Sequence, residues 1–307
     1  MIAIPRSMSR RTTLAGLALP MAGLAGPAQS RAFVTRVPIR ESGMTATLFL
    51  PEQPRNAPAV ISLAGQEGGL FESPAAALAA EGFATLAVAT HNAPGKPQRL
   101  SCIPLEDIDT AITWLRDRAK PRDGIVALRG WSRGGEAALT LASLSANVNA
   151  VLAYAPRCYV GREQDKQNNF DDPTAAPAWL WRGQPVVGET LRPEMRPDLK
   201  QQSFEDWFGI AVERIRGPIM IVCGEADTGI AGTTAMRSAT YAMHRLDLLH
   251  SPIRRTLLQY GDAGHDIAVP PPYHGTAEGG GTIAGNTAAV ADSWPRTVTF
   301  LRSLTSS

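Results

Sequence analysis

Short apolar segments recur along this chain and alternate with longer stretches that mix apolar and polar residues. Each segment has the length of a β-strand and contains almost no charged residue, and turn-forming residues such as glycine and proline separate the segments. Such strands are typical of a parallel sheet that is covered on both faces. The predicted strands are residues 45–50, 59–63, 84–89, 125–128, 151–154, 219–223 and 256–258.

Helical patterns lie between several of these segments. In one of them Leu105, Ile108, Ile112 and Leu115 repeat at helical spacing, and Pro104 suits a first helical turn, where a missing N–H costs little. The alternation of strands and helices predicts an α/β fold with a doubly wound, mostly parallel sheet, in which ligands bind at the carboxyl ends of the strands. The predicted crossover helices are residues 73–81, 104–118 and 135–144.

The stretch from residue 157 to residue 216 interrupts this alternation. It is polar, is divided by prolines, and carries Trp179, Trp181, Trp207 and Phe208. We expect a cap inserted into the fold rather than a second domain. Because inserted caps commonly shape specificity, Trp179 and Trp181 are candidates for lining a substrate pocket.

The first 32 residues have a different character from the rest. Arg10 and Arg11 precede a weakly apolar stretch, residues 14–26, and a segment of small residues that ends near Ala32. This arrangement resembles a twin-arginine export signal, and the apolar stretch is far shorter than the ~20 residues that span a bilayer. We expect residues 1–32 to be removed, the twin-arginine export machinery to be a transient partner, and the mature domain, residues 33–307, to be periplasmic or secreted.

Composition narrows the possible partners. The 307 residues are 44% hydrophobic, enough for one sizeable core, and 30 basic against 28 acidic residues give a net charge of +2. No basic cluster is interleaved with aromatic residues, so a nucleic-acid partner is not expected. The three cysteines lack C-x-x-C spacing, which argues against a zinc or redox site. Cys223 fits a buried strand, and a disulfide between Cys102 and Cys158 is left open.

The strongest chemical signal is Gly130-Trp131-Ser132-Arg133-Gly134. A predicted strand precedes this G-x-S-x-G motif and a predicted helix follows it, which is the context of a nucleophile elbow. Glycines at both ends allow neighbouring backbones to approach a sharp turn, where any Cβ would clash. We therefore predict that Ser132 is a catalytic nucleophile.

A serine hydroxyl needs a general base that is oriented by a carboxylate. In α/β-hydrolases the order along the chain is Ser, acid, His. Asp227 follows the predicted strand that ends at Cys223, and His265 follows the strand that ends near Tyr260. We predict that His265 is the base and that Asp227 orients it.

Several other titratable residues are alternatives. Glu225 lies earlier in its turn than the acid normally does, and Asp262 and Asp266 are very close to His265 in sequence. His91, at the end of a predicted strand, is a candidate for lining the pocket, as is His274. For the remaining histidines, a structural role on the surface or in the core is expected: His244 and His250.

Acyl transfer also requires hydrogen-bond donors for the developing oxyanion. One should be the backbone N–H of Arg133, the residue after the nucleophile. The other is expected from the glycine-rich loop of residues 64–69, and we favour the N–H of Gln66. Gly65 and Trp131 are further candidates for lining the pocket. No metal or cofactor is implied.

With these residues in place, the chain resembles the C-terminal catalytic domain of the acyl-CoA thioesterase and bile acid-CoA:amino acid acyltransferase family, and more distantly the dienelactone hydrolases. The resemblance implies an α/β-hydrolase catalytic domain that acts on a small-molecule acyl ester or thioester. Serine rather than cysteine at position 132 favours hydrolysis over acyl transfer, while a non-catalytic binding protein is the remaining alternative. The matching segments are residues 63–70, 104–106, 131–136, 178–185, 263–265 and 292–295.

Overall fold

Apolar side chains at successive strand positions bury both faces of a central sheet. In β6 (Val126–Trp131), Leu128 packs into one core cluster and Ala127 into another, and in β3 (Ala59–Leu63) Ile61 and Val60 divide in the same way. This arrangement follows from the period of two along a strand, which turns successive side chains to opposite faces. The sheet therefore needs helices on both sides.

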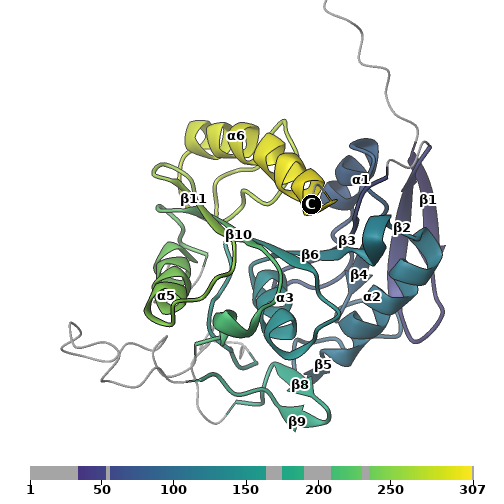
Figure 1. Cartoon of the computed structure of the whole chain (residues 1–307). Coiled ribbons are helices and arrows are strands. Elements are labelled where there is room, and N and C mark those ends of the chain that lie inside the picture. Colours follow the sequence, from purple (N-terminus) through teal and green to yellow (C-terminus); the bar gives the residue numbers. More distant parts are fainter. Residues whose placement is uncertain (1–33, 53–55, 164–174, 190–208, 230–234, 306–307) are drawn as a thin grey trace, which may run out of the picture. The chain divides into compact units, whose positions relative to one another are not determined.

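The computed structural model describes residues 34–52, 56–163, 175–189, 209–229 and 235–305. Its main sheet has eight strands in the order β1-β2-β4-β3-β6-β7-β10-β11, and β2 is antiparallel to both neighbours, whereas all other neighbouring strands are parallel (Figure 1). The predicted doubly wound, mostly parallel α/β fold is thus confirmed. The bounds of the other strands are β1 Val34–Ile39, β2 Thr45–Pro51, β4 Thr85–Ala89, β7 Ala150–Tyr154, β10 Ile219–Gly224 and β11 Arg255–Tyr260.

Five helices cover the two faces of the sheet in the described part of the chain (Figure 1). Side chains of α2, α3 and α5 join the core on one face, and those of α1 and α6 join the core on the other. No helix of the described residues is long and apolar enough to cross a membrane. The bounds are α1 Glu72–Ala80, α2 Glu106–Ala119, α3 Arg133–Leu144, α5 Ala235–Leu248 and α6 Ile283–Arg302.

Two local predictions from the sequence were wrong or incomplete, and one question that the sequence left open is answered. Pro104 does not begin a helix, because residues 103–104 form β5, which pairs with β8 (Trp179–Trp181) in a small separate sheet completed by β9 (Gln184–Pro185). Helices α5 and α6 were not predicted. No disulfide joins Cys102 to Cys158, since all three cysteines are thiols.

The predicted export signal and parts of the predicted cap segment, residues 157–216, lie outside the described residues. Within that segment the structure describes β8, β9 and a short 3-10 helix, η3 (Val212–Arg214), which packs against α3 and α5. Helix α3, which follows the predicted nucleophile Ser132, therefore contacts elements of the predicted cap segment directly.

Candidate active site

Ser132 lies at the tip of a sharp turn between β6 and α3. Its backbone has φ 53° and ψ −117°, a left-handed conformation that is costly for a residue with a Cβ. The backbone N–H of Ser132 donates to the carbonyl of Tyr154 at 2.9 Å, so the turn is fastened to the neighbouring strand β7. The side chain is held at the carboxyl end of the sheet and at the N-terminus of α3, where the helix dipole favours negative charge.

The two glycines of the motif are required by close backbone packing. A Cβ at Gly130 would lie 2.1 Å from the carbonyl oxygen of Gly134, and a Cβ at Gly134 would lie 2.3 Å from the carbonyl oxygen of Ala64. Both distances are far below van der Waals contact. The steric reason predicted for these glycines is confirmed.

His265 and Asp227 meet at the carboxyl ends of β11 and β10. His265 Nδ1 donates to Asp227 Oδ2 at 2.9 Å, and both side chains are buried. The second carboxylate oxygen, Oδ1, accepts the backbone N–H of Gly229 at 2.8 Å, which fixes the plane of the carboxylate. With Nδ1 as the donor, Nε2 of the neutral imidazole is the nitrogen that can accept a proton.

The residue next to Ser132 connects the elbow to the histidine. The indole Nε1 of Trp131 donates to the backbone carbonyl of His265 at 3.0 Å, and the two rings lie with centroids 5.5 Å apart. The hydroxyl of Ser132 itself makes no hydrogen bond to His265 among the described residues. Catalytic hydrogen bonds commonly shorten only when substrate is bound.

The alternative acids and histidines are placed elsewhere. Glu225 is exposed, and Asp266 accepts the backbone N–H of Gly279 rather than meeting the imidazole of His265. Among the described residues, His265 has an ion-pair contact with Asp227 alone. Four more of these residues are exposed or only partly buried: Asp262, His244, His250 and His274.

The 64–69 loop is fastened to the turn that follows β4. His91 Nε2 lies 2.9 Å from the carbonyl oxygen of Gln66, Asn92 Nδ2 donates to the carbonyl of Glu67 at 2.7 Å, and Gly69 N–H donates to the carbonyl of His91 at 2.9 Å. Burial lowers the pKa of His91, which favours the neutral ring. The neutral ring donates from Nε2 to Gln66 and accepts at Nδ1 from the hydroxyl of Thr90, 3.0 Å away.

This geometry is matched by a family assignment. The family described as BAAT / acyl-CoA thioester hydrolase C terminal matches residues 103–307. The chain belongs to this family. The predicted resemblance is therefore confirmed, and the matched region of this thioester hydrolase family includes Ser132, Asp227 and His265.

Curated relatives agree with the family. Acyl-coenzyme A thioesterase 1 of Rattus norvegicus is 30% identical over 243 residues, which cover 78% of this chain and 55% of the relative. Peroxisomal succinyl-coenzyme A thioesterase of Mus musculus is 28% identical over 281 residues, which cover 87% of this chain and 65% of the relative. The chain thus spans only about half to two thirds of the length of these relatives.

Solved structures support the fold. A truncated carbohydrate esterase from gut microbiota superposes with a TM-score of 0.56 at 14% identity, covering 92% of this chain and 100% of the other. A putative dienelactone hydrolase from Klebsiella pneumoniae gives a TM-score of 0.55 at 16% identity, covering 89% and 99%. At these identities the likeness establishes the α/β-hydrolase fold and nothing finer.

In this member of the family, β6 also holds the histidine loop through a second side chain. Arg129, two residues before Trp131 and on the same side of the strand, is fully buried and donates to the carbonyl of Ala268. Its guanidinium lies over the rings of Tyr154, at 4.6 Å, and Phe71, at 5.5 Å. Burial lowers the pKa of Arg129 to about 10, so the group is still cationic at neutral pH.

A second buried network surrounds Glu136 in the first turn of α3. Its carboxylate accepts from the Arg133 guanidinium at 2.6 Å, the Trp179 indole at 2.7 Å and the Gly161 backbone N–H at 2.8 Å. Arg133 also donates to the carbonyl of Arg162 at 3.0 Å. Burial lowers the pKa of Arg133 to about 10 in spite of the Glu136 carboxylate. These bonds connect α3 to the predicted cap segment.

The residues expected to line a pocket take different positions. Trp179 is 1% exposed with its indole bound to Glu136, whereas Trp131 and Trp181 are partly exposed. Gly65 lies against Ser132, and His91 borders a cavity beside Gln66. Three arginines of the predicted cap segment differ in the same way: the side chain of Arg162 donates to a backbone carbonyl, Arg182 is exposed, and Arg192 lies outside the described residues.

Sequence reasoning missed Arg129, Glu136 and the run of residues 279–281. The carbonyl of Gly279 accepts the N–H of His265 at 2.9 Å and that of Thr228 at 3.1 Å, so this segment joins the acid and histidine loops. Three consecutive glycines were a signal for such close packing. Nothing local marks Arg129 or the burial of Glu136, because Ala268, which accepts from Arg129, and Gly161 and Trp179, which donate to Glu136, lie far away in sequence. The described residues contain no group of side chains suited to hold a metal ion.

Proposed function

We propose that this protein is a serine hydrolase that cleaves the acyl bond of an ester or thioester through an acyl-enzyme. Ser132 is the nucleophile, His265 is the general base and acid, and Asp227 orients the imidazole. The observation that carries the proposal is the buried 2.9 Å bond between His265 Nδ1 and Asp227 Oδ2, at the same edge of the sheet as the strained Ser132 turn. Membership of the thioester hydrolase family supports it.

In the first half of the reaction, His265 Nε2 takes the proton of Ser132 as Oγ attacks the acyl carbonyl carbon. The carbonyl oxygen becomes an oxyanion, and the imidazolium that forms is stabilised by Asp227. When the tetrahedral intermediate collapses, the bond to the alcohol or thiol breaks and His265 gives that leaving group its proton. In the second half, His265 takes a proton from water as the water attacks the acyl-enzyme. The bond between the acyl carbon and Ser132 Oγ then breaks, the carboxylic acid leaves, and His265 returns the proton to Ser132.

The oxyanion requires two donors that are already in place before the reaction. We assign these roles to the backbone N–H groups of Arg133 and Gln66. The first lies at the N-terminus of α3, and the second lies in the loop that is fastened by His91 and Asn92. Loss of one such donor costs roughly 3 kcal/mol of transition-state stabilisation.

A fluorophosphonate probe tests the nucleophile. We expect the folded protein to acquire one adduct, which mass spectrometry places on Ser132, and we expect Ser132→Ala to abolish both labelling and hydrolysis of p-nitrophenyl acetate. Ser143→Ala is a matched control, because Ser143 lies on α3, which follows Ser132, and among the described residues it bonds the carbonyl of Thr140 alone. A folded protein that is not labelled at Ser132, or a Ser132→Ala variant that retains the wild-type rate, overturns the proposal.

We further propose that residues 1–32 direct export by the twin-arginine route, so that the enzyme acts outside the cytoplasm. The proposal is supported by the paired Arg10 and Arg11 before a short, weakly apolar stretch. Fractionation of cells that express the whole chain should find a shortened protein in the periplasm or medium, and replacement of both arginines by lysine should retain it inside. Export that does not depend on the arginines would contradict this route.

A further inference from the structure

A cavity of about 230 Å³ lies beside the 64–69 loop and reaches the predicted cap segment. Its lining residues include Gln66, Glu67 and Asn92, together with Arg99 and Glu163. The space equals roughly eight water molecules at about 30 Å³ each, which is room for a small polyol or a sugar ring. The cavity is too small for a complete drug-sized ligand, which typically needs about 300 Å³ or more.

Gly65 precedes Gln66 of the cavity lining and lies close to Ser132. A Cβ placed on Gly65 would lie 3.3 Å from Ser132 Cβ and 2.9 Å from Glu67 Oε2. Ser132 Cβ and the Glu67 carboxylate therefore both lie within 3.3 Å of the same point. A group bound in the cavity would lie next to an acyl carbonyl that is held over Ser132.

Two hydrogen-bond acceptors of the lining residues have no partner among the described residues. Arg99 and Glu163 neutralise each other in a 2.6 Å ion pair. The Glu67 carboxylate has no ion pair or hydrogen bond in the described part of the chain, although the Glu67 backbone is held by Asn92. The side-chain oxygen Oε1 of Gln66 is buried and likewise has no hydrogen-bond partner among the described residues, a condition that a bound donor would relieve.

We propose that this cavity binds a hydrogen-bond-donating part of the substrate, a hydroxylated or ammonium-bearing group next to the scissile acyl bond, and that Glu67 determines specificity for it. The proposal rests on the proposed function, because it places the group relative to Ser132. A carboxylate without a counter-charge repels phosphates and carboxylates. An alkyl chain in a polar cavity would displace water without replacing the hydrogen bonds that water makes to the lining. Hydroxyl and ammonium groups share the required chemistry, since both donate to Glu67 and Gln66.

Three acetates of similar size test the subsite. The first is a methyl glucoside acetylated on its primary hydroxyl, and the second is cyclohexylmethyl acetate. The third is cyclohexylmethyl acetate that carries an aminomethyl group on its ring. We expect the wild-type protein to hydrolyse at least one of the two donor-bearing esters with a kcat/KM about tenfold or more above that of the apolar ester. Which donor ester is preferred identifies the hydroxylated or the ammonium source.

The Glu67→Gln variant isolates the carboxylate. We expect it to lose most of the preference for the donor-bearing ester, with the larger loss for an ammonium group, because an amide retains an acceptor but not the charge. Glu81→Gln is the matched control: Glu81 pairs with Arg302 at the surface, and its replacement should leave the preference unchanged.

Three results would overturn the proposal. The first is a kcat/KM for the apolar ester that equals those of both donor-bearing esters. The second is a preference for the donor-bearing ester that persists in Glu67→Gln. The third is a preference for acetyl-CoA over all three acetates that does not change in Glu67→Gln. Hydrolysis of p-nitrophenyl acetate separates these results from failure of the proposed function. If that ester is not hydrolysed and Ser132 is not labelled, the hydrolase assignment fails and the subsite falls with it.

Discussion

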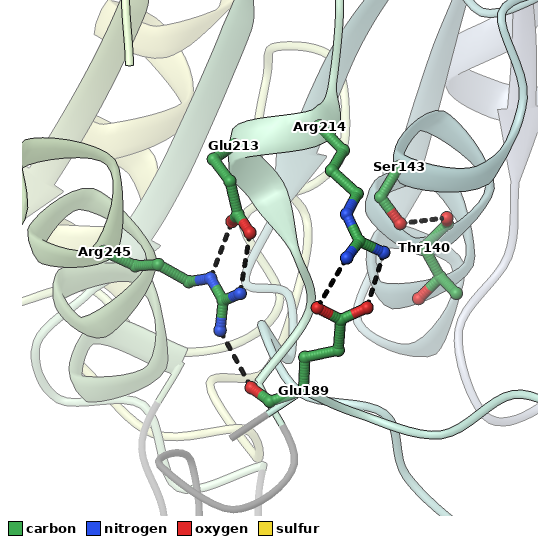
Figure 2. A network of polar contacts seen from close by, with 6 residues as sticks. All are labelled: Thr140, Ser143, Glu189, Glu213, Arg214 and Arg245. Carbon is green, nitrogen blue, oxygen red and sulfur yellow. Dashed lines mark hydrogen bonds and ion pairs between the residues drawn. The ribbon is translucent and has the colours of Figure 1, made fainter. Parts of the chain in front are cut away.

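Helix α3 is flanked by two acid–arginine networks that use the same residue types in different surroundings. At its first turn, Glu136 is completely buried and accepts from Arg133, Trp179 and Gly161. Further along the helix, beside Thr140 and Ser143, two arginines and two glutamates form the network that Figure 2 shows. In that network Arg214 bonds both carboxylate oxygens of Glu189, and Arg245 bonds both carboxylate oxygens of Glu213.

The two networks differ in how far water can reach their charged side chains. The Arg133 and Glu136 side chains are 2% and 0% exposed, whereas those of Arg214 and Glu189 are 54% and 42% exposed. A buried charge that loses its partner keeps its full desolvation cost, while an exposed charge is rehydrated. An arginine–glutamate pair is therefore expected to contribute much to stability at Glu136, where it is buried, and little at Glu189, where it is exposed.

The largest effect is expected from Glu136→Ala. The change leaves the Arg133 guanidinium buried without a carboxylate and removes the acceptor for Trp179 and Gly161. The free energy of unfolding should therefore fall by about 3–5 kcal/mol. Because Arg133 follows Ser132 directly, kcat on p-nitrophenyl acetate should fall as well. Urea unfolding and initial rates measure the two effects.

Glu136→Gln is the informative partner of that variant. The amide oxygen can still accept from Trp179 and Gly161, but the charge that neutralises Arg133 is lost. An intermediate loss of stability is expected. If Glu136→Ala is destabilised by less than about 1 kcal/mol, as an exposed pair would be, the contrast between the two networks is wrong.

The degree to which each network can be predicted from sequence follows from the separation of its residues. Arg133 and Glu136 are three residues apart on one helix, but Gly161 and Trp179, which bury them, come from the predicted cap segment. Each of the three proposed catalytic residues, by contrast, follows a strand that can be predicted from the apolar residues of the strand itself. Local patterns thus place residues at strand ends, and they do not show which polar side chains are buried.

The same reasoning explains the errors in the fold. Helix α6 follows a run of glycines and contains Pro295, which argues against a helix until the core packing of Trp294 and Val298 is known. Pro104 has a sequence typical of a helix start, but it pairs with Leu180, more than seventy residues later along the chain. Strand pairs between distant segments leave no periodic signal in either segment.

A smaller effect is expected from Arg245→Met. The Arg245 side chain is 4% exposed and bonds both the Glu213 carboxylate and the backbone carbonyl of Glu189, but Glu213 is 20% exposed and can be rehydrated. We expect a loss of about 1–3 kcal/mol, between the values for the buried and the exposed pair. Arg118→Met, which removes an exposed arginine from α2, is the comparison for loss of an arginine. Urea unfolding of both variants measures the difference, and equal losses would contradict the role of Glu213.

Glu213 adds a dependence on pH. Burial is the largest single influence and opposes its ionisation, but the hydrogen bonds to its carboxylate and the charges of Arg245 and Arg214 together outweigh burial and lower the pKa of Glu213 below its ordinary value of 4.5. The folded state thus binds the proton more weakly than the unfolded state, so this stabilisation is present above pH 4.5 and is lost as the pH falls through the lowered pKa. The difference in unfolding free energy between wild type and Glu213→Gln should be largest near neutral pH and should narrow in acid. A difference that is constant from neutral pH to acid would show that the carboxylate charge is not responsible.

The smallest effect is expected from Arg214→Ala in the exposed part of the network. The bidentate geometry to Glu189 is good, but both side chains are about half exposed, and an exposed pair contributes roughly 0–1 kcal/mol. Because exposed charges are screened, that contribution should decrease further when salt is raised from low to about 1 M. Urea unfolding of wild type and Arg214→Ala at two salt concentrations measures it. A loss of several kcal/mol that salt does not reduce would mean that this pair behaves like the buried pair at Glu136, and exposure would then no longer explain the difference between the networks.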